Sequence, residues 1–589
     1  MNPEATAIIE EKPSSSNDAA THIEHASAAD SPQETSIDNV DIEGAQESFT
    51  WDLDIWLNLT ALWGCYLTST YSLAIPNSSI SFISAAFPEE AGISIWIASS
   101  VTIANCVIQA FLGDLSDHFG RKWPLLLGMA LIFAGSMIAG RADSMGMVIG
   151  GQVLNGIGLT CGFLAIPLSA EIVPKDQRAR VQALSGIFAG LAYISGPIIA
   201  GAFIKYNVGG DGEGWRAPFY FLAGLSGLTF ILIVVFYHPA PRPNPENLSP
   251  MTRFLKIDWI GVFLAAAGLT LFLVGIESGD NPTPWVSGRV LACIIVGGVC
   301  MIVFCLWEWL AVSDGIVAHS LFTDANYPIC LVLNFVGGIV MFGGQAFLPQ
   351  EITALFTSDA IMTGVWNIPF NAMTIGGAMA SAVVLGITKE AKWTVVAAFV
   401  MLLVGTCLML VMKPHINYAA WFFPTALLGT AVGIMTSLLI IVVSICTPNH
   451  LIASAVSVAA AARALGGSIG TVIFSQIFAS KIKSFLPEEV ADEALKAGLP
   501  QSSLPAFLQA LSTKQESALM AVRGVTPTIL AAAERGVGNA YAHAFKFVWY
   551  SLIPFSVVSL GLSFWLRSTR PQLTQQVAAQ VEHKHRHHS

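Results

Sequence analysis

The chain has 589 residues, of which 54% are hydrophobic and only 11% are charged. Soluble domains carry about 25% charged residues, so this composition excludes an ordinary water-soluble protein. Of the net charge of −11, −10 falls within residues 1–50, which we expect to form a disordered acidic tail. The nine cysteines stand singly, and basic residues do not gather with aromatic ones, so neither a metal site nor nucleic-acid binding is expected.

Continuous apolar stretches of about 20 residues, the length that crosses a bilayer, follow this tail. They run approximately over 56–76, 93–112, 124–140, 146–170, 182–204, 217–237, 258–277, 289–310, 328–348, 362–386, 393–412, 420–446, 452–479 and 543–566. The runs are continuous rather than alternating, which favours helices over a membrane barrel. The expected fold class is therefore an all-α membrane protein with about 14 transmembrane helices.

Lysine and arginine in the short loops predict the orientation, because cytoplasmic loops carry an excess of both. Twelve such residues fall on the side shared with the N-terminus and five on the other. We therefore expect both termini in the cytoplasm of a multi-pass protein of the plasma membrane, with the vacuolar membrane as the alternative. The long segment 480–542 is then outside, with helix-like stretches near 488–495 and 504–511, and its prolines, Pro487 among them, are expected to punctuate it.

The loop after the second span combines turn glycines with charges at the membrane edge. Its pattern comprises Gly113, Asp117, Gly120, Arg121 and Lys122. Glycine allows a tight return into the third span, and the charges can pair or contact helix ends. One interpretation is a simple positive-inside anchor; the other is a specific cytoplasmic gate.

The fourth and fifth spans carry further small or polar residues. Gln152 and Asn155 share a helix face, where their amides either bind another helix or line a watery cavity. In the fifth span glycines at helical spacing allow close backbone approach, as a packing face or a functional one. These residues are Gly186, Gly190, Gly196, Pro197 and Gly201.

One strong charge falls inside a predicted span, Arg463 of the thirteenth. An ionisable residue within the membrane is a candidate for function. The alternative is that its long side chain reaches the interface.

These motifs resemble the major facilitator superfamily, whose loop between spans two and three reads G-x-x-x-D-[RK]-x-G-[RK]-[RK], with His118 replacing the usual base here. The Gly196-Pro197 pair resembles the antiporter motif of its exporters. With Asp258-Trp259-Ile260-Gly261, Pro284-Trp285 and the segment Ala540-Tyr541-Ala542-His543, the chain looks like the fungal 14-span drug:proton antiporters of the trichothecene efflux pump-like group.

The resemblance implies two six-helix bundles, at 51–237 and 311–566, the second including the outer loop 480–542. A linker with two inserted spans (238–310) joins them, and 567–589 forms a cytoplasmic tail. Substrate then binds between the bundles, which rock to alternate access. Candidate cavity residues are polar or aromatic side chains within apolar spans: Gln152, Asn155, Asn334, Gln345, Trp366, Asn367 and Asn371.

Proton antiport, which the resemblance implies, needs a carboxylate, yet no Asp or Glu lies centrally in a predicted span. Glu171, Glu277, Glu308 and Glu351 fall near span ends, where water would keep them ionised. Glu351, beside the predicted cavity mouth, is the candidate for ion coupling; the alternative is a solvated interfacial charge.

The sequence thus predicts a secondary active transporter that exports a small organic molecule, such as a secondary metabolite, mycotoxin or drug, in exchange for protons. No enzyme motif and no cofactor site is expected, and the chain lacks the Gly-Lys pair of a P-loop, so ATP is not a partner. The partners are the substrate, the proton gradient and the lipid bilayer. An importer of siderophores or nutrients and a membrane sensor that does not transport remain alternatives.

Overall fold

The structure is a computed structural model that describes residues 51–173, 175–210, 212–239, 258–279, 283–310, 321–322, 324–414, 416–447, 452–512, 522 and 524–569. The expected disordered tail, 1–50, lies outside these residues, as does most of the C-terminal tail. Segments next to the predicted bundle boundaries at 237 and 311 are also outside, so those boundaries stay predictions.

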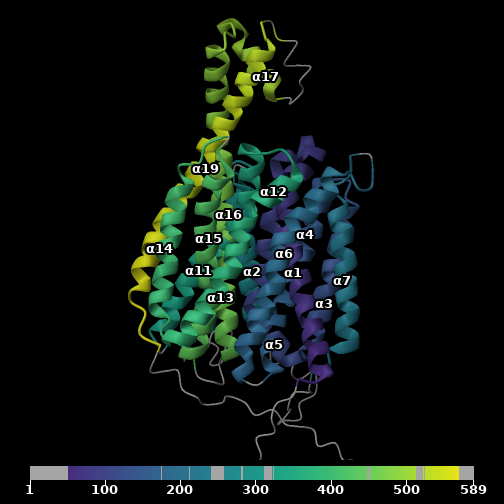
Figure 1. Ribbon diagram of the computed structural model, residues 1–589, viewed down its shortest axis with the longest axis vertical. Helices are drawn as coiled ribbons and strands as arrows, with labels where there is room; N and C mark the ends of the chain where they lie inside the picture. The colour runs from purple at the N-terminus through teal and green to yellow at the C-terminus, as the bar shows by residue number, and fades with distance from the viewer. Residues whose placement is uncertain are drawn as a thin grey trace, which may run out of the picture. The chain divides into compact units, whose positions relative to one another are not determined.

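Long helices that run side by side make up the described part of the chain (Figure 1). The first group is α1 (Leu53–Ala86), α2 (Trp96–Phe119), α3 (Lys122–Gly140), α4 (Met145–Phe163) with α5 (Ala165–Glu171), α6 (Lys175–Lys205) and α7 (Ala217–Phe236). An inserted pair, α9 (Trp259–Ser278) and α10 (Gly288–Leu310), follows. The second group is α11 (Asn326–Leu355), α12 (Ala360–Trp366) with α13 (Ile368–Thr388), α14 (Lys392–Met409), α15 (Tyr418–Cys446), α16 (Ile452–Lys496) and α19 (Pro527–Ser563).

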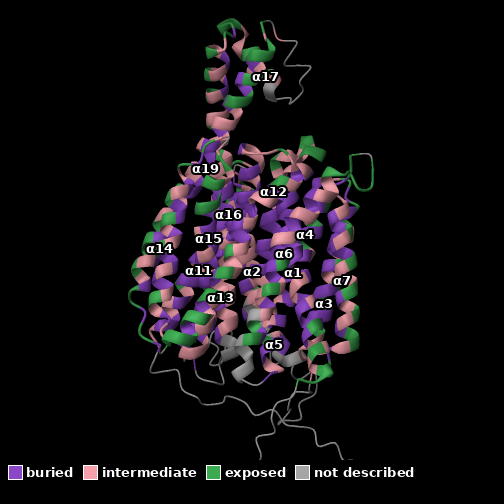
Figure 2. Cartoon of the chain, viewed as in Figure 1, coloured by how far each residue is buried: buried purple, intermediate pink, exposed green. Residues whose placement is uncertain are grey.

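Twelve of these segments, among the described residues, are long and apolar enough to cross a membrane. α1 and α2 complete the fourteen that the sequence predicts: the apolar part of α2 among the described residues is shorter, Trp96–Gln109, and α1 carries buried hydroxyl side chains. Thr68, Ser69 and Ser72 of α1 are fully buried, for example. By contrast, α10 exposes Ile295, Val299 and other apolar side chains along its length, as a lipid-facing helix does. Figure 2 likewise shows exposed residues along α7 and α14, at the two edges of the view. The all-α membrane fold class is confirmed.

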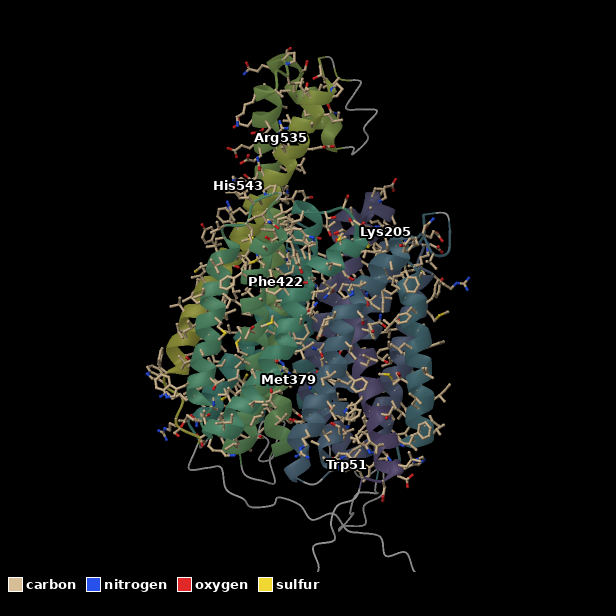
Figure 3. The ribbon with its side chains drawn as sticks, viewed as in Figure 1. Trp51, Lys205, Met379, Phe422, Arg535 and His543 are labelled. Carbon is tan, nitrogen blue, oxygen red and sulfur yellow. The ribbon has the colours of Figure 1, made fainter. Side chains whose placement is uncertain are left out.

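Each group packs chiefly within itself, and three seams join the groups. α2 packs against α16, α6 against α12 and α13, and α1 against α11, while α9 lies beside both α2 and α16. Trp51 and Lys205 lie at opposite ends of the helices (Figure 3). We call these the Trp51 end and the Lys205 end.

At the Lys205 end, α16 and α19 extend well beyond the other helices (Figure 1). α16 has 45 residues, which at about 1.5 Å per residue is far longer than a bilayer core of about 30 Å. With α17 (Leu504–Ser512) the extensions bury a small apolar cluster around Val490, Phe507 and Ile529. Pro487 lies inside α16, so the expectation that it would interrupt the segment is wrong.

Candidate functional site

The loop between α2 and α3 ties the Trp51 end of the first group together. Gly120 ends α2 with φ +88°, in the left-handed region that favours glycine. Arg121 pairs with Glu171 at the end of α5, and Lys122 Nζ donates to the Val234 carbonyl of α7 at 3.0 Å. These basic residues therefore bind helix ends of their own group. The surroundings of Gly113 and the side chain of Asp117 lie outside what the structure describes.

The glycines of α6 face different neighbours. A Cβ at Gly201 would lie 2.3 Å from the Ala360 carbonyl oxygen, and one at Gly190 would overlap Ile375 of α13. Gly196 faces Ala74 and Tyr71 of α1, whereas a Cβ at Gly186 would meet nothing within 4 Å. Gly190 and Gly201 thus form the seam between groups, Gly196 packs within the first group, and Pro197 lies inside the helix between them.

An ion pair joins the two groups where this seam ends. Lys205, the last residue of α6, binds Asp359. Asp359 also caps α12, because its Oδ1 accepts from Ile361 N at 2.9 Å. The Lys205 ammonium lowers the pKa of the Asp359 carboxyl below its usual value. Together with Gly201, the pair holds the Lys205 end of the α6–α12 seam closed.

Gln152 and Asn155 are fully buried on α4 and bind each other. Asn155 Nδ2 donates to Gln152 Oε1 at 2.9 Å, and Ser136 Oγ of α3 donates to Asn155 Oδ1 at 3.3 Å. Gln152 Nε2 has no partner among the described residues. Asn155 thus bonds α4 to α3, and the assignment of both residues to a cavity stays a prediction.

Gln345 and Asn371 form a chain of hydrogen bonds that crosses between the groups. Gln345 Nε2 of α11 donates to Asn371 Oδ1 of α13 at 2.8 Å, and Asn371 Nδ2 donates to the Tyr193 carbonyl of α6 at 2.9 Å. Asn371 is 1% exposed. Asn371 thereby connects α11 and α13 of the second group with α6 of the first.

Trp366 and Asn367 occupy the break between α12 and α13. Pro369 has no N–H for the carbonyl four residues earlier, and that carbonyl, of Val365, instead accepts from Tyr418 Oη at 3.3 Å. The Trp366 carbonyl accepts from Trp421 Nε1 at 2.9 Å. The Trp366 ring itself stacks on Phe356. Asn367 is 2% exposed, and neither of its side-chain polar atoms has a partner among the described residues.

Asn334 and Arg463 are the remaining predicted residues of the interior. Asn334 is buried, and its Nδ2 donates to the Cys330 carbonyl at 2.9 Å within α11. Arg463 Nη1 donates to the Thr436 carbonyl of α15 at 3.3 Å. Because Thr436 lies well inside α15 (Tyr418–Cys446), the guanidinium does not reach a helix end, as the alternative of an interfacial position required.

Glu351 lies inside α11 and is 1% exposed, so the expectation that water would surround it is wrong. Its Oε2 accepts from Trp549 Nε1 of α19 at 3.0 Å. The predicted span stopped at 348, before Pro349, but the helix continues through this proline to Leu355. Neighbouring helices make such a proline tolerable in a membrane.

Glu277 at the end of α9 is a second buried carboxylate, and placing it in water was the same error. It is fully buried, and its Oε1 accepts from Ser475 Oγ of α16 at 3.1 Å. Gln476 Nε2 donates to the Glu277 carbonyl at 3.0 Å. The inserted pair is thereby attached to α16. No local sequence signal marks this burial, because it depends on α16, which is distant in the sequence.

Comparison with known proteins shows which family this chain is similar to. The family model of the fungal trichothecene efflux pump (TRI12) matches residues 70–589. The chain is 26% identical over 537 residues to the trichothecene efflux pump TRI12 of Trichoderma arundinaceum, covering 87% of this chain and 86% of that one. It is 25% identical over 393 residues to the MFS transporter L2 of a Phoma species, covering 66% of this chain and 64% of that one.

Among solved structures, a bacterial homolog of the human lysosomal transporter Spinster, in an inward-facing and unoccupied conformation, has a similar fold. The TM-score is 0.53 at 14% identity, covering 89% of this chain and 98% of that one. This likeness concerns the fold alone. The matching family model is that of an efflux pump and not of an enzyme. With a family match over most of its length, the chain belongs to the fungal trichothecene efflux pump family of the major facilitator superfamily.

Proposed function

We propose that this protein exports a small organic molecule, a secondary metabolite, mycotoxin or drug, in exchange for protons across the plasma membrane. The observation that carries the proposal is Glu351, a carboxylate within α11 that is almost fully buried and is bound, among the described residues, by one neutral donor, Trp549 Nε1. The efflux pumps of Trichoderma arundinaceum and Fusarium sporotrichioides among the relatives support export.

A coupling residue must hold a proton in one conformation and release it in another. An ionised carboxylate in a membrane span is costly unless it is paired, and among the described residues no cation pairs with Glu351. Trp549 donates one hydrogen bond and accepts none, so it tolerates either protonation state of Glu351. α19 would then respond to proton binding on α11, because this bond joins the two helices.

Alternating access fits the contacts between the two groups. The seam of α6 with α12 is closed at the Lys205 end by Lys205–Asp359 and by the close approach at Gly201. The hydrogen-bond chain through Gln345, Asn371 and Tyr193 lies further along the same seam. Rocking of the two bundles would break these contacts and open the Lys205 end, which the positive-inside rule assigns to the outside.

The first prediction tests coupling at Glu351. A fungal host without its own drug pumps would express the full chain, and efflux of labelled neutral, acidic and basic metabolites would be measured. A transported metabolite is then followed in liposomes with an imposed pH gradient. Glu351→Gln keeps the side-chain shape but cannot titrate, so we expect at least about a tenfold loss of gradient-driven transport, with exchange of substrate down its own gradient retained.

Glu534→Gln, at an exposed position of α19, is the matched control and should transport like wild type. Full proton-driven transport by Glu351→Gln would show that another group, such as Glu277, couples transport. Accumulation rather than loss of the metabolite in cells would favour an importer. If no metabolite moves in cells or liposomes, the protein is a sensor rather than a transporter.

A further inference from the structure

Glu277, in the last turn of α9, lies where the inserted pair meets the seam between α2 and α16. Its side chain is fully buried, and its Oε1 accepts from Ser475 Oγ of α16 at 3.1 Å. Gln476 Nε2 donates to the Glu277 carbonyl at 3.0 Å, so α16 holds both the side chain and the backbone of this residue. The second carboxyl oxygen, Oε2, has no hydrogen-bond partner among the described residues.

No positive side chain in the described part of the chain pairs with this carboxyl group. On one side of it, α2 carries no charged residue over 96–113. On α16 the next cation toward the Lys205 end is Lys481, whose Nζ lies over the Phe547 ring, 4.3 Å from its centroid, and Arg289 of α10 is exposed. Asp280 lies outside the described residues, and its carboxylate would add charge of the same sign. An ionised carboxylate buried without a counter-charge is costly, whereas a protonated one needs none.

The turn of α16 that binds Glu277 also contacts the hydrogen-bond partner of Glu351. Phe474, which precedes Ser475, packs against Trp549 of α19 with ring centroids 6.3 Å apart. Trp549 Nε1 in turn donates to Glu351 Oε2 at 3.0 Å. Two adjacent residues of α16 therefore connect the two buried carboxyl groups, although one belongs to the inserted pair and the other to the second group.

We propose that Glu277 is a second proton-binding site, carried by the inserted pair and separate from Glu351. It holds a proton while α2, α9 and α16 enclose it, and the neutral acid keeps the hydrogen bond from Ser475. Separation of α2 from α16 admits water, which stabilises the carboxylate and takes up the proton. The inserted pair is then part of the proton-binding machinery rather than a passive addition to the two bundles. This site requires neither export nor coupling at Glu351.

Infrared spectroscopy of the purified full chain in lipid tests the site without a substrate. Exposed carboxylates stay ionised from about pH 6 to about pH 9, because their pKa values lie near about 4, so the C=O stretch of a protonated acid reports buried carboxyl groups. We expect wild type to lose this band reversibly as the pH rises, and Glu277→Gln to start with about half of its amplitude, the rest belonging to Glu351. Glu534→Gln, at an exposed position of α19, should keep the whole band.

An unchanged band in Glu277→Gln would show that Glu277 is ionised throughout and would overturn the proposal. If Glu277→Gln does not fold, Ser475→Ala decides. It removes the donor to Oε1 and should move part of the band to higher frequency, while Ser468→Ala, which removes a hydroxyl bonded to Thr102 on the same helix, should leave the band in place. An unmoved band in Ser475→Ala would count against the site. A Glu277 band without proton-driven transport would refute the proposed function and leave this site standing.

Discussion

The pairing of Arg121 with Glu171 gives the loop after α2 a role at the scale of single residues. Both side chains are partly exposed, Arg121 by 25% and Glu171 by 38%, and such ion pairs contribute little to stability. The free energy of unfolding is therefore not what this pair controls. Its position suggests instead that it keeps the ends of α3 and α5 in register while the bundles move.

We accordingly predict that Arg121→Glu and Glu171→Arg each impair transport several-fold, because each places like charges together. The double variant restores the attraction and should recover most of the activity. Efflux rates of the four forms, normalised to the amount of protein in the membrane, measure this coupling. Strictly additive losses in the double variant would mean that the two residues act independently.

The sequence showed which residues of this loop carry charge, but not which distant residues they pair with. The charged loop was recognisable from Gly120, Arg121 and Lys122, but Glu171 is 50 positions away and no local pattern connects it to Arg121.

At the scale of elements, the seam between α6 and α12 depends on a glycine, whose lack of a side chain lets the two helices approach closely. A Cβ at Gly201 would lie 2.3 Å from the Ala360 carbonyl oxygen and 2.9 Å from Ile361 N, both backbone atoms that cannot turn aside. Gly201→Ala must therefore separate α6 from α12. Overpacking of this kind destabilises a structure by about 1–3 kcal/mol. Here it would destabilise the conformation in which the Lys205 end is closed.

The prediction is that Gly201→Ala reduces efflux strongly and shifts the protein toward a form in which the Lys205 end is open. Gly186→Ala is the matched control on the same helix, because a Cβ there meets nothing within 4 Å, and it should behave as wild type. Efflux and the labelling rate of a cysteine introduced at Ser358, beside the Lys205–Asp359 pair, report the two effects. Equal behaviour of both alanine variants would exclude close packing at Gly201 as a requirement.

Helix positions followed from apolar run length, whereas helix ends did not. Both α11 and α16 continue through a proline, Pro349 and Pro487 respectively. Contacts from other elements hold these continuations: Trp549 binds Glu351 beyond Pro349, and Val490 joins an apolar cluster beyond Pro487. Composition alone cannot reveal such contacts, because they form between distant segments.

At the scale of the whole molecule, the seams differ in chemistry along their length. The Lys205 end carries an exposed ion pair, Lys205–Asp359, while the α2–α16 seam is bonded through Ser468 Oγ, which donates to the Thr102 carbonyl at 2.8 Å. Glu277 attaches the inserted pair to α16. α9 can therefore sense the separation of α2 from α16, although it belongs to neither bundle.

The distribution of charge predicts the orientation of the molecule, and the orientation decides which end faces the cell exterior. Twelve Lys and Arg residues in short loops lie on the N-terminal side and five on the other; this excess should keep the Trp51 end in the cytoplasm. The apolar cluster around Val490, Phe507 and Ile529 would then form outside.

Cysteine labelling tests this orientation. Ser502→Cys, at an exposed position beside α17, and Lys389→Cys, at an exposed position between α13 and α14, mark the two ends. In intact cells a membrane-impermeant maleimide should label the first variant, and the second only after permeabilisation, with the wild-type chain as the blank for its own cysteines. Labelling in the reverse order would show that the transporter has the opposite orientation. Lys205–Asp359 would then lie on the cytoplasmic side.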